Sequence, residues 1–140
     1  MIDLKVVGSF FDQDKVIRAA DRATRRVLSR FGAYVRTSAR HSIRRRKATS
    51  KPGQPPSSHT GLLRRHIYFS YDARARDVVI GPVPMGAKTS APETLEHGGR
   101  VVQRRRGRRQ TLAYAARPYM GPALRKELPK LGGMWANSIR

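Results

Sequence analysis

The chain has 140 residues, of which 39% are hydrophobic, and this is enough for one modest core but not for two, so we expect a single domain spanning residues 1–140. It carries 30 Lys and Arg against 9 Asp and Glu, and the resulting formal charge of +21 must be balanced by a polyanion, an acidic protein surface or bulk counterions. The absence of cysteine excludes disulfides and thiolate sites, and no apolar run approaches the roughly 20 residues that a membrane span needs.

The first predicted elements are a short strand and a long helix. Met1 to Val7 has the pattern of a strand with charges inside it and lacks the clean apolar stretch of a secretory signal. Apolar residues then recur at steps of three or four, which predicts one face of a helix from Asp14 to Arg46: Val16, Ala20, Ala23, Val27, Phe31, Val35, Ala39 and Ile43. Arg44 to Lys47 would complement the negative end of that helix, and Gly32 inside it would allow a close contact or a bend.

The opposite face of this helix carries an arginine ridge, whose members are Arg18, Arg22, Arg26, Arg30, Arg36, Arg40 and Arg44. A solvated face is the ordinary interpretation of such a stretch. However, like charges at four-residue spacing repel each other, and a solvated face usually intersperses acids between them. Two interpretations therefore stay open at this point, a solvated face and a surface that binds a polyanion.

The middle of the chain predicts a loop, a helical turn and a hairpin. Proline, glycine and hydroxyl residues near positions 48–59 favour a mobile loop that does not pack into a core. Thr60 can cap a short helical turn through Arg64. Ile67 to Tyr71 and Val78 to Gly81 have the composition of two strands with a polar connector, and a second irregular loop is expected near positions 82–92.

The last third of the chain predicts a second hairpin and a closing helix. Glu93 to His97 can form a helical turn that stops at the glycines which follow. Arg100 to Arg104 and Gln110 to Ala115 are expected to be strands around a basic tip near positions 104–109. Pro122 suits the first turn of a closing helix, in which Leu124, Leu128 and Leu131 would share a face until Pro129 breaks or kinks it.

Together these elements predict an α+β fold. A long N-terminal helix and a shorter C-terminal helix would pack on a mostly antiparallel sheet of about four to five strands. Trp135 and Ile139 would continue the apolar face beyond the kink.

Four short motifs occur in a fixed order. They are a Pro/Ser-rich loop at Pro52 to Ser58, a Thr-Gly-x-Leu-Arg turn at Thr60 to Arg64, a Glu-x-Gly corner at Glu96-His97-Gly98, and a Pro-aromatic-x-x-Pro-Ala-Leu elbow at Pro118 to Leu124. In this order the chain resembles the tail-completion or head-tail joining (neck) proteins of long-tailed bacteriophages. The resemblance covers about the last two thirds of the chain, and the first third matches only as a long amphipathic helix.

The resemblance implies a sixfold ring around the channel through which the genome leaves, and it implies which residues meet other subunits. These are Pro55, Pro56, Thr60, Gly61, Leu62, Arg64, Glu96, Gly98, Arg117, Pro118, Tyr119, Met120, Pro122 and Leu124. Ring formation is expected to bury Tyr119 and Met120, or the loop, against the next subunit. Glu96 is either a surface residue or the partner of an arginine in the same or a neighbouring subunit, and the resemblance favours the ion pair.

Residues that would carry catalysis or hold a metal are scarce in the sequence. None of the four histidines, His41, His59, His66 and His97, has a partner at metal-ligand spacing with a nearby carboxylate. No Gly-x-Ser-x-Gly elbow and no phosphate-binding loop of the Walker type occurs. We therefore expect no enzyme activity, no metal and no cofactor.

Two functions remain compatible with the sequence. The first is a structural protein of the phage neck or tail end, which is assembled into the virion in the host cytoplasm. It would contact copies of itself, adjacent neck, connector or tail proteins, and packaged DNA, but no membrane. The second is a stand-alone protein that binds nucleic acid without sequence preference. The expected contacts with DNA or an acidic surface are Arg44, Arg45, Arg46, Arg104, Arg105, Arg106, Arg108 and Arg109. We favour the first function, because the aromatic strand near Tyr68 does not match an RNA-binding sheet motif.

Overall fold

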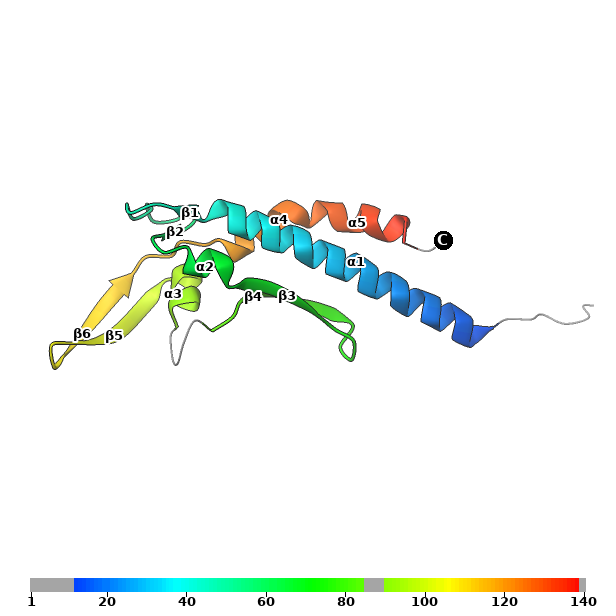
Figure 1. Cartoon of the computed structure of the whole chain (residues 1–140), viewed down its shortest axis with the longest axis horizontal. Helices are drawn as coiled ribbons and strands as arrows, with labels where there is room; N and C mark the ends of the chain where they lie inside the picture. Colours follow the sequence, from blue (N-terminus) through cyan, green and yellow to red (C-terminus); the bar gives the residue numbers. More distant parts are fainter. Residues whose placement is uncertain (1–11, 85–89, 139–140) are drawn as a thin grey trace, which may run out of the picture.

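The computed structural model describes residues 12–84 and 90–138, so the strand expected at residues 1–7 and the side chain of Ile139 lie outside the described residues. Along the chain the elements are α1 (Gln13–Ser42), β1 (Arg44–Arg45), β2 (Ser57–Ser58), α2 (Leu62–Arg65), β3 (Ile67–Asp72), β4 (Asp77–Pro82), α3 (Ala91–His97), β5 (Gly99–Arg105), β6 (Arg108–Tyr114), α4 (Met120–Glu127) and α5 (Pro129–Ala136). The fold class is α+β, as the sequence predicts. Figure 1 shows α1 as the longest element, with α4 and α5 along one side of it.

The long helix α1 begins where the sequence predicts and ends earlier. The carboxylate of Asp12 accepts a hydrogen bond from the amide of Lys15 at 2.9 Å and so caps the first turn. The helix stops at Ser42, because Ile43 is extended and buried and the next two residues form β1, which pairs in parallel with β2. The predicted end at Arg46 is therefore wrong, and Arg40 and His41 occupy the last turn instead.

The hydrophobic core forms around the carboxy-terminal two thirds of α1. Its buried side chains come from α1, from α2 and β3, and from the start of α4: Phe31, Val35, Ala39, Ile43, Leu63, Ile67, Tyr119 and Ala123. The predicted apolar face of α1 is confirmed from Ala23 onward, whereas Val16 and Ala20 are exposed. The first turns of α1 therefore extend beyond the core, as Figure 1 shows at the blue end of the helix.

The hairpin of β3 and β4 packs directly against α1. Its strands pair antiparallel from Ile67 opposite Pro82 to Asp72 opposite Asp77. The contact is close at Gly32, where a Cβ atom would lie 2.8 Å from Cγ2 of Val78 and 2.9 Å from the ring of Phe69. A helix with a side chain at this position would be held away from the hairpin, so the glycine serves the close contact expected from the sequence.

The strands form three separate two-stranded sheets, and not the single sheet of four to five strands that we expected. β1–β2 is parallel, while β3–β4 and β5–β6 are antiparallel. Only one face of the β5–β6 hairpin is half-buried, at Val101, Leu112 and Tyr114, and its other face is exposed. The hairpin projects from the helices at the left of Figure 1, and within the described residues it pairs with no other strand.

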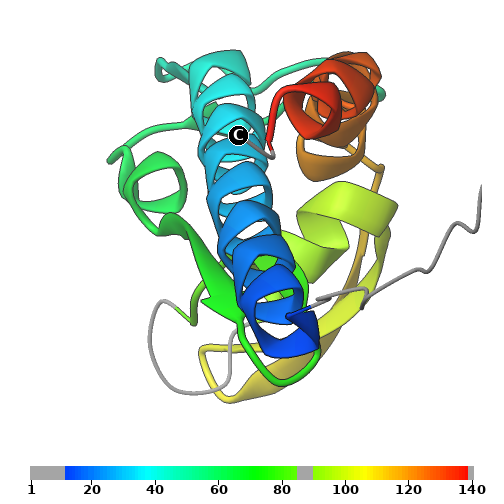
Figure 2. The same ribbon diagram turned by 90° about the vertical axis from the view of Figure 1, so that its right-hand side faces the viewer.

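The C-terminal segment forms two helices that meet at Pro129, and both lie beside α1 (Figure 2). Of the three leucines predicted to share an apolar face, Leu131 packs against the core, whereas Leu124 is 42% exposed and Leu128 is 51% exposed. Ala123 and Glu127 are buried instead. The carboxylate of Glu127 accepts hydrogen bonds from Ser38 of α1 and from Lys130, so a polar residue takes the inward position.

Candidate functional site

The carboxylate of Glu96 holds the start of α4. Its Oε2 accepts hydrogen bonds from the amides of Tyr119 at 2.8 Å and Met120 at 3.0 Å, and its Oε1 accepts one from Gly121 at 2.8 Å. These are the free amides at the positive end of a helix, and a carboxylate from another element satisfies them. Within the described part of the chain Glu96 forms no ion pair with an arginine. Pairing with an arginine of a neighbouring subunit stays a prediction.

The contact between the Glu96 carboxylate and the start of α4 determines the charge states of Glu96 and Tyr119. Burial by itself would raise the pKa of Glu96, but the three amides and the neighbouring His97 outweigh it, so the pKa lies below its ordinary value. Burial, together with the negative charge of Glu96, raises the pKa of Tyr119 to about 12. Glu96 is therefore a carboxylate and Tyr119 a neutral phenol at neutral pH.

Tyr119 itself is a core residue of the protomer. Its side chain is 1% exposed and belongs to the same cluster as Leu63 and Ile67. The expectation that ring formation buries Tyr119 against the next subunit is therefore wrong, because folding of the single chain already buries it. Met120 packs against the same cluster, and Pro118 and Pro122 are half-buried beside it.

The proline-rich loop is bound to the segment just before the elbow. The amide of Gly53 donates to the carbonyl of Ala116 at 2.8 Å, and Nε of Arg117 donates to the carbonyl of Ser50 at 3.0 Å. The amide of Arg117 donates to the carbonyl of Leu95 in α3 at 2.6 Å. Contrary to the expectation from composition, part of this loop is packed, since Ser50 and Pro56 are buried.

The Glu-x-Gly corner needs its glycine. Gly98 has a φ of 74°, and a Cβ atom there would lie 3.0 Å from the amide nitrogen of Ala116 and 3.0 Å from the carbonyl oxygen of Tyr114. Both the backbone angle and the space exclude a larger residue. The corner, the loop and the elbow are thus joined by backbone contacts, and we call this set of contacts the elbow junction.

The Thr-Gly-x-Leu-Arg turn joins the elbow junction through the core. Gly61 occupies the N-cap position of α2 with a φ of 79°, and its amide donates to Oγ of Ser58 at 3.0 Å. Thr60 accepts from the amide of Leu62 at 3.3 Å. Leu63 is buried in the cluster that contains Tyr119, while Leu62 and Arg64 are exposed. Of the predicted contact residues, Pro56, Gly61 and Tyr119 are buried, Pro55 is half-buried, and Thr60, Leu62, Arg64 and Leu124 are at the surface.

The arginine ridge of α1 is divided into two parts. Nε of Arg36 donates to the carbonyl of Ile67 at 2.9 Å. Nε and Nη2 of Arg40 donate to the carbonyls of Arg64 at 2.7 Å and Arg65 at 2.9 Å. These two arginines therefore tie α1 to α2 and β3, a structural role that their spacing in the sequence does not reveal. Arg18, Arg22 and Arg26 are exposed on the projecting half of the helix.

The tip of the β5–β6 hairpin brings arginines of both strands together. Arg104 lies opposite Arg109 and Arg105 lies opposite Arg108, while Arg106 and Gly107 form the turn with positive φ angles. The described side chains of this tip are exposed, and the side chain of Arg105 lies outside the described part. Arg44 and Arg45 of β1 and the following Arg46 are exposed, and Nε of Arg46 donates to Oγ of Ser57 at 2.9 Å. The predicted arginines thus form two separate surfaces.

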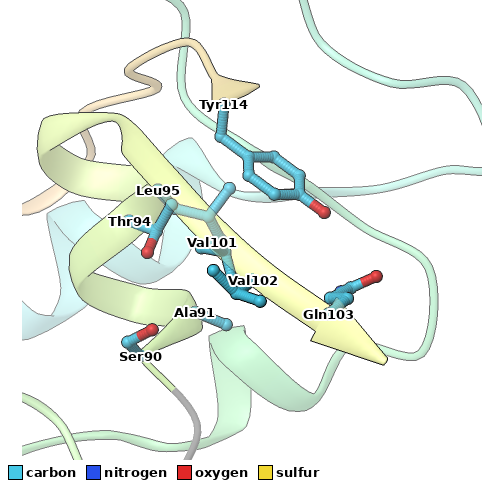
Figure 3. Close-up of a pocket in the computed structure, with 8 residues that line it drawn as sticks. All are labelled: Ser90, Ala91, Thr94, Leu95, Val101, Val102, Gln103 and Tyr114. Carbon is cyan, nitrogen blue, oxygen red and sulfur yellow. The ribbon is translucent and has the colours of Figure 1, made fainter. Parts of the chain in front are cut away.

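An apolar groove of about 380 Å³ lies between α3 and the root of the β5–β6 hairpin (Figure 3). It is lined by Ser90, Ala91, Thr94, Leu95, Val101, Val102, Gln103 and Tyr114. Tyrosine is the only titratable side chain among them, so the groove offers no acid/base pair. Over residues 12–84 and 90–138 no cluster of His, Asp and Glu could hold a metal ion, and no helix combines the length and the apolar character needed to cross a membrane.

Comparison of the chain with models of protein families, with curated proteins and with solved structures found no match.

Proposed function

We propose that this chain is a structural protein of a bacteriophage particle, which forms one ring of the neck or tail end around the DNA channel. One observation carries the proposal: the four motifs of the resemblance, spread over residues 52–124, converge on the elbow junction and the core beside it. Glu96 of the corner binds the elbow, and Gly53 of the loop binds Ala116 just before it. Leu63 of the turn shares a cluster with Tyr119. Motifs that build one structural unit support a resemblance better than four independent surface segments would.

The proposed role is mechanical and electrostatic, without a catalytic step. Exposed apolar side chains suit contacts with other subunits. Such side chains are Val16 and Ile17 at the start of α1, Leu124 and Leu128 on α4 and after it, and Val102 on β5. The ring would have the sixfold symmetry that the resemblance implies and would assemble into the virion in the host cytoplasm.

The charge of the chain predicts when the ring forms. A protomer with a formal charge of +21 repels its copies unless an anion or an acidic surface screens them. We therefore expect a monomer or a weak oligomer in low salt, and a closed ring only on the partner assembly. Analytical ultracentrifugation at low and high salt measures this, and a stable ring in low salt without partner or DNA would show that subunit contacts outweigh the repulsion.

The direct test of the neck role is the composition of purified particles. Quantitative mass spectrometry of phage particles from the genome that encodes this chain should find it at a fixed ratio to the other neck and tail proteins. Deletion of its gene should leave heads and tails unjoined, or tails incomplete, in electron micrographs of the lysate. Infectious particles that lack the chain would contradict the proposal.

The arginine tip of β5–β6 favours a second candidate, a stand-alone protein that binds nucleic acid. A channel lining must let DNA slide, so the neck role predicts loose binding that is the same for unrelated duplexes at near-physiological salt. Tight binding to one sequence or one structure in a fluorescence anisotropy titration would favour the second candidate instead.

A further inference from the structure

A basic hollow of about 330 Å³ lies between the end of α1, β1 and α2. It is lined by Thr37, Arg40, His41, Arg45, Thr60, Gly61, Arg64 and Arg65. Four guanidinium groups and one imidazole therefore surround a space that no carboxylate lines. We call it the arginine hollow. In Figure 1 its elements lie at the end of the molecule opposite the N-terminus of α1.

The arginine hollow is held in shape by one of its own arginines. Arg40 donates through Nε to the carbonyl of Arg64 and through Nη2 to the carbonyl of Arg65, at 2.7 and 2.9 Å. These bonds fix α2 against α1, so that two further arginines start from a rigid backbone on the rim. A site built in this way loses less conformational entropy when it binds an anion than a set of arginines on a flexible segment.

The charge of the arginine hollow has no counter-charge in the described part of the chain. The ion pairs found there join Arg76 to Asp21 and Lys130 to Glu127, away from the hollow. A second copy of the chain is a poor source of carboxylates, since it brings 9 acids with 30 Lys and Arg. Several of these acids are also engaged within their own chain, as Glu96 is with the elbow.

We propose that the arginine hollow binds phosphate groups of a nucleic-acid backbone. Guanidinium groups match phosphate oxygens with two parallel hydrogen bonds, and the threonine hydroxyls at the rim add neutral donors. No Phe, Tyr or Trp lines the hollow, so it lacks the large aromatic rings on which successive bases stack in single-strand binding grooves. Its binding is therefore independent of sequence. The inference rests on the DNA contact of the proposed function but does not depend on the neck role.

The test compares two variants of the full-length chain with the same net charge. The hollow variant carries Arg45→Gln, Arg64→Gln and Arg65→Gln, three exposed residues, and it keeps Arg40 because that side chain holds α2. The control variant carries Arg18→Gln, Arg22→Gln and Arg25→Gln, which are exposed on α1. Each variant loses three charges and falls from +21 to +18 (21 − 3). Circular dichroism verifies that both are folded.

The expected result is a selective loss of DNA binding in the hollow variant. With short duplexes of several unrelated sequences, the removal of each phosphate contact should reduce the magnitude of the negative slope of log K against log salt by about 0.9. The affinity should then fall roughly eightfold at 0.1 M salt. The control variant should be weakened much less. Equal weakening of the two variants would overturn the proposal, because it would show that only the overall charge matters.

Two further probes identify the source of the anion. Phosphate stabilises folded proteins in general relative to chloride. At the same ionic strength, it should therefore raise the melting temperature of the wild type and the control variant by more than that of the hollow variant. Polyglutamate should compete with the duplex less strongly than an equal charge of unlabelled duplex. Stabilisation by phosphate without a change in duplex binding would assign the hollow to free phosphate, and stronger competition by polyglutamate would assign it to an acidic protein. Both outcomes overturn the nucleic-acid assignment, and neither affects whether the chain is found in particles.

Discussion

The two antiparallel hairpins have similar backbones and opposite environments. Each has an arginine with positive φ in its turn, Arg76 at 54° in β3–β4 and Arg106 at 50° in β5–β6. In the first hairpin the inner face packs on α1 at Gly32, and Arg76 forms an ion pair with Asp21 at 3.2 Å. In the second hairpin arginine lies opposite arginine at two successive pairs, and the strands project from the helices.

The hairpin that packs on α1 also has an acidic partner for its arginine, whereas the hairpin that projects has no acid opposite its arginines. An isolated two-stranded hairpin is only marginally stable in water, and like charges directly opposite each other weaken it further. The β5–β6 hairpin is therefore expected to depend on the elbow junction at its root and on an anion at its tip. The β3–β4 hairpin depends on the core. The predictions that follow from this contrast are given from the largest expected effect on stability to the smallest.

The largest expected effect is at the start of the packed hairpin. Ile67 is 0% exposed, so Ile67→Ala leaves a cavity in the core and should lower the free energy of unfolding by about 2–5 kcal/mol. Val102 in the projecting hairpin is 62% exposed, and Val102→Ala should change the free energy of unfolding by about 0.5 kcal/mol or less. Urea denaturation measures both, and equal losses would show that the two hairpins are packed alike.

The next effect concerns the root of the projecting hairpin. Glu96→Gln weakens three hydrogen bonds to α4 and should cost about 1–3 kcal/mol at pH 7, whereas Glu93→Gln in the exposed first turn of α3 should cost about 0.5 kcal/mol or less. Because the folded pKa of Glu96 is lowered, its contribution is complete above the unfolded pKa of about 4.3 and is lost as the pH falls through the folded value.

Acid denaturation gives an independent measure of the same contact. The folded pKa of Glu127 is also lowered, chiefly by the hydrogen bond from Lys130, so both residues make the wild type less stable below about pH 4. Glu96→Gln should therefore lose less stability than the wild type between pH 7 and pH 3. A variant that loses as much as the wild type over this range would show that Glu96 is not ionised in the elbow junction.

A smaller effect is expected where the packed hairpin touches α1. Gly32→Ala gains about 1 kcal/mol of helix propensity, but its methyl group would lie 2.8 Å from Val78, so the net change should be a loss of about 1–2 kcal/mol. A Cβ atom on Gly133 in α5 would meet no described atom within 4 Å beyond its chain neighbours and the nearby backbone of its own helix, and Gly133→Ala should gain up to about 1 kcal/mol. Thermal melts of the two variants should therefore move in opposite directions.

The smallest change in stability is expected near the tips of the two hairpins. Arg109→Glu creates an opposite-charge pair with Arg104 and should stabilise by about 0.2–1 kcal/mol, whereas Arg76→Glu places two carboxylates together at Asp21 and should destabilise by a similar amount. Both variants lower the net charge by two, to +19 (21 − 2). Only Arg109→Glu should weaken duplex binding in anisotropy titrations by more than the change in net charge explains, and equal weakening would exclude the tip as a DNA contact.

The local elements can be predicted from the sequence because their patterns are short-range. The apolar periodicity of α1, the β-branched and aromatic strands of β3–β4, and the Gly-terminated turn of α3 each depend on residues close together in the chain. The basic tip of β5–β6 follows from its arginines in the same way. The end of α1 does not follow from such a pattern, because Ile43 leaves the helix to enter the core, and this is decided by tertiary packing.

The elbow junction cannot be predicted in this way because its contacts join distant residues. Glu96 lies 23 residues before Tyr119, and nothing in the local sequence indicates that its carboxylate caps α4. Likewise, the spacing of Arg36 and Arg40 indicates a charged surface, whereas both side chains bind backbone carbonyls of β3 and α2. Leu124 and Leu128 have helical periodicity, yet Glu127 faces inward because Ser38 and Lys130 satisfy its carboxylate.

The contacts of α1 with the end of the chain have a consequence for synthesis on the ribosome. The face of α1 that contains Phe31 and Val35 is covered by Tyr119 and Ala123, and Ser38 of α1 bonds Glu127, 89 residues further along. During translation the helix therefore emerges long before the residues that cover it. The part of its apolar face that α4 covers stays open to water, or to a chaperone, until α4 has left the exit tunnel, and contacts over such long separations close slowly.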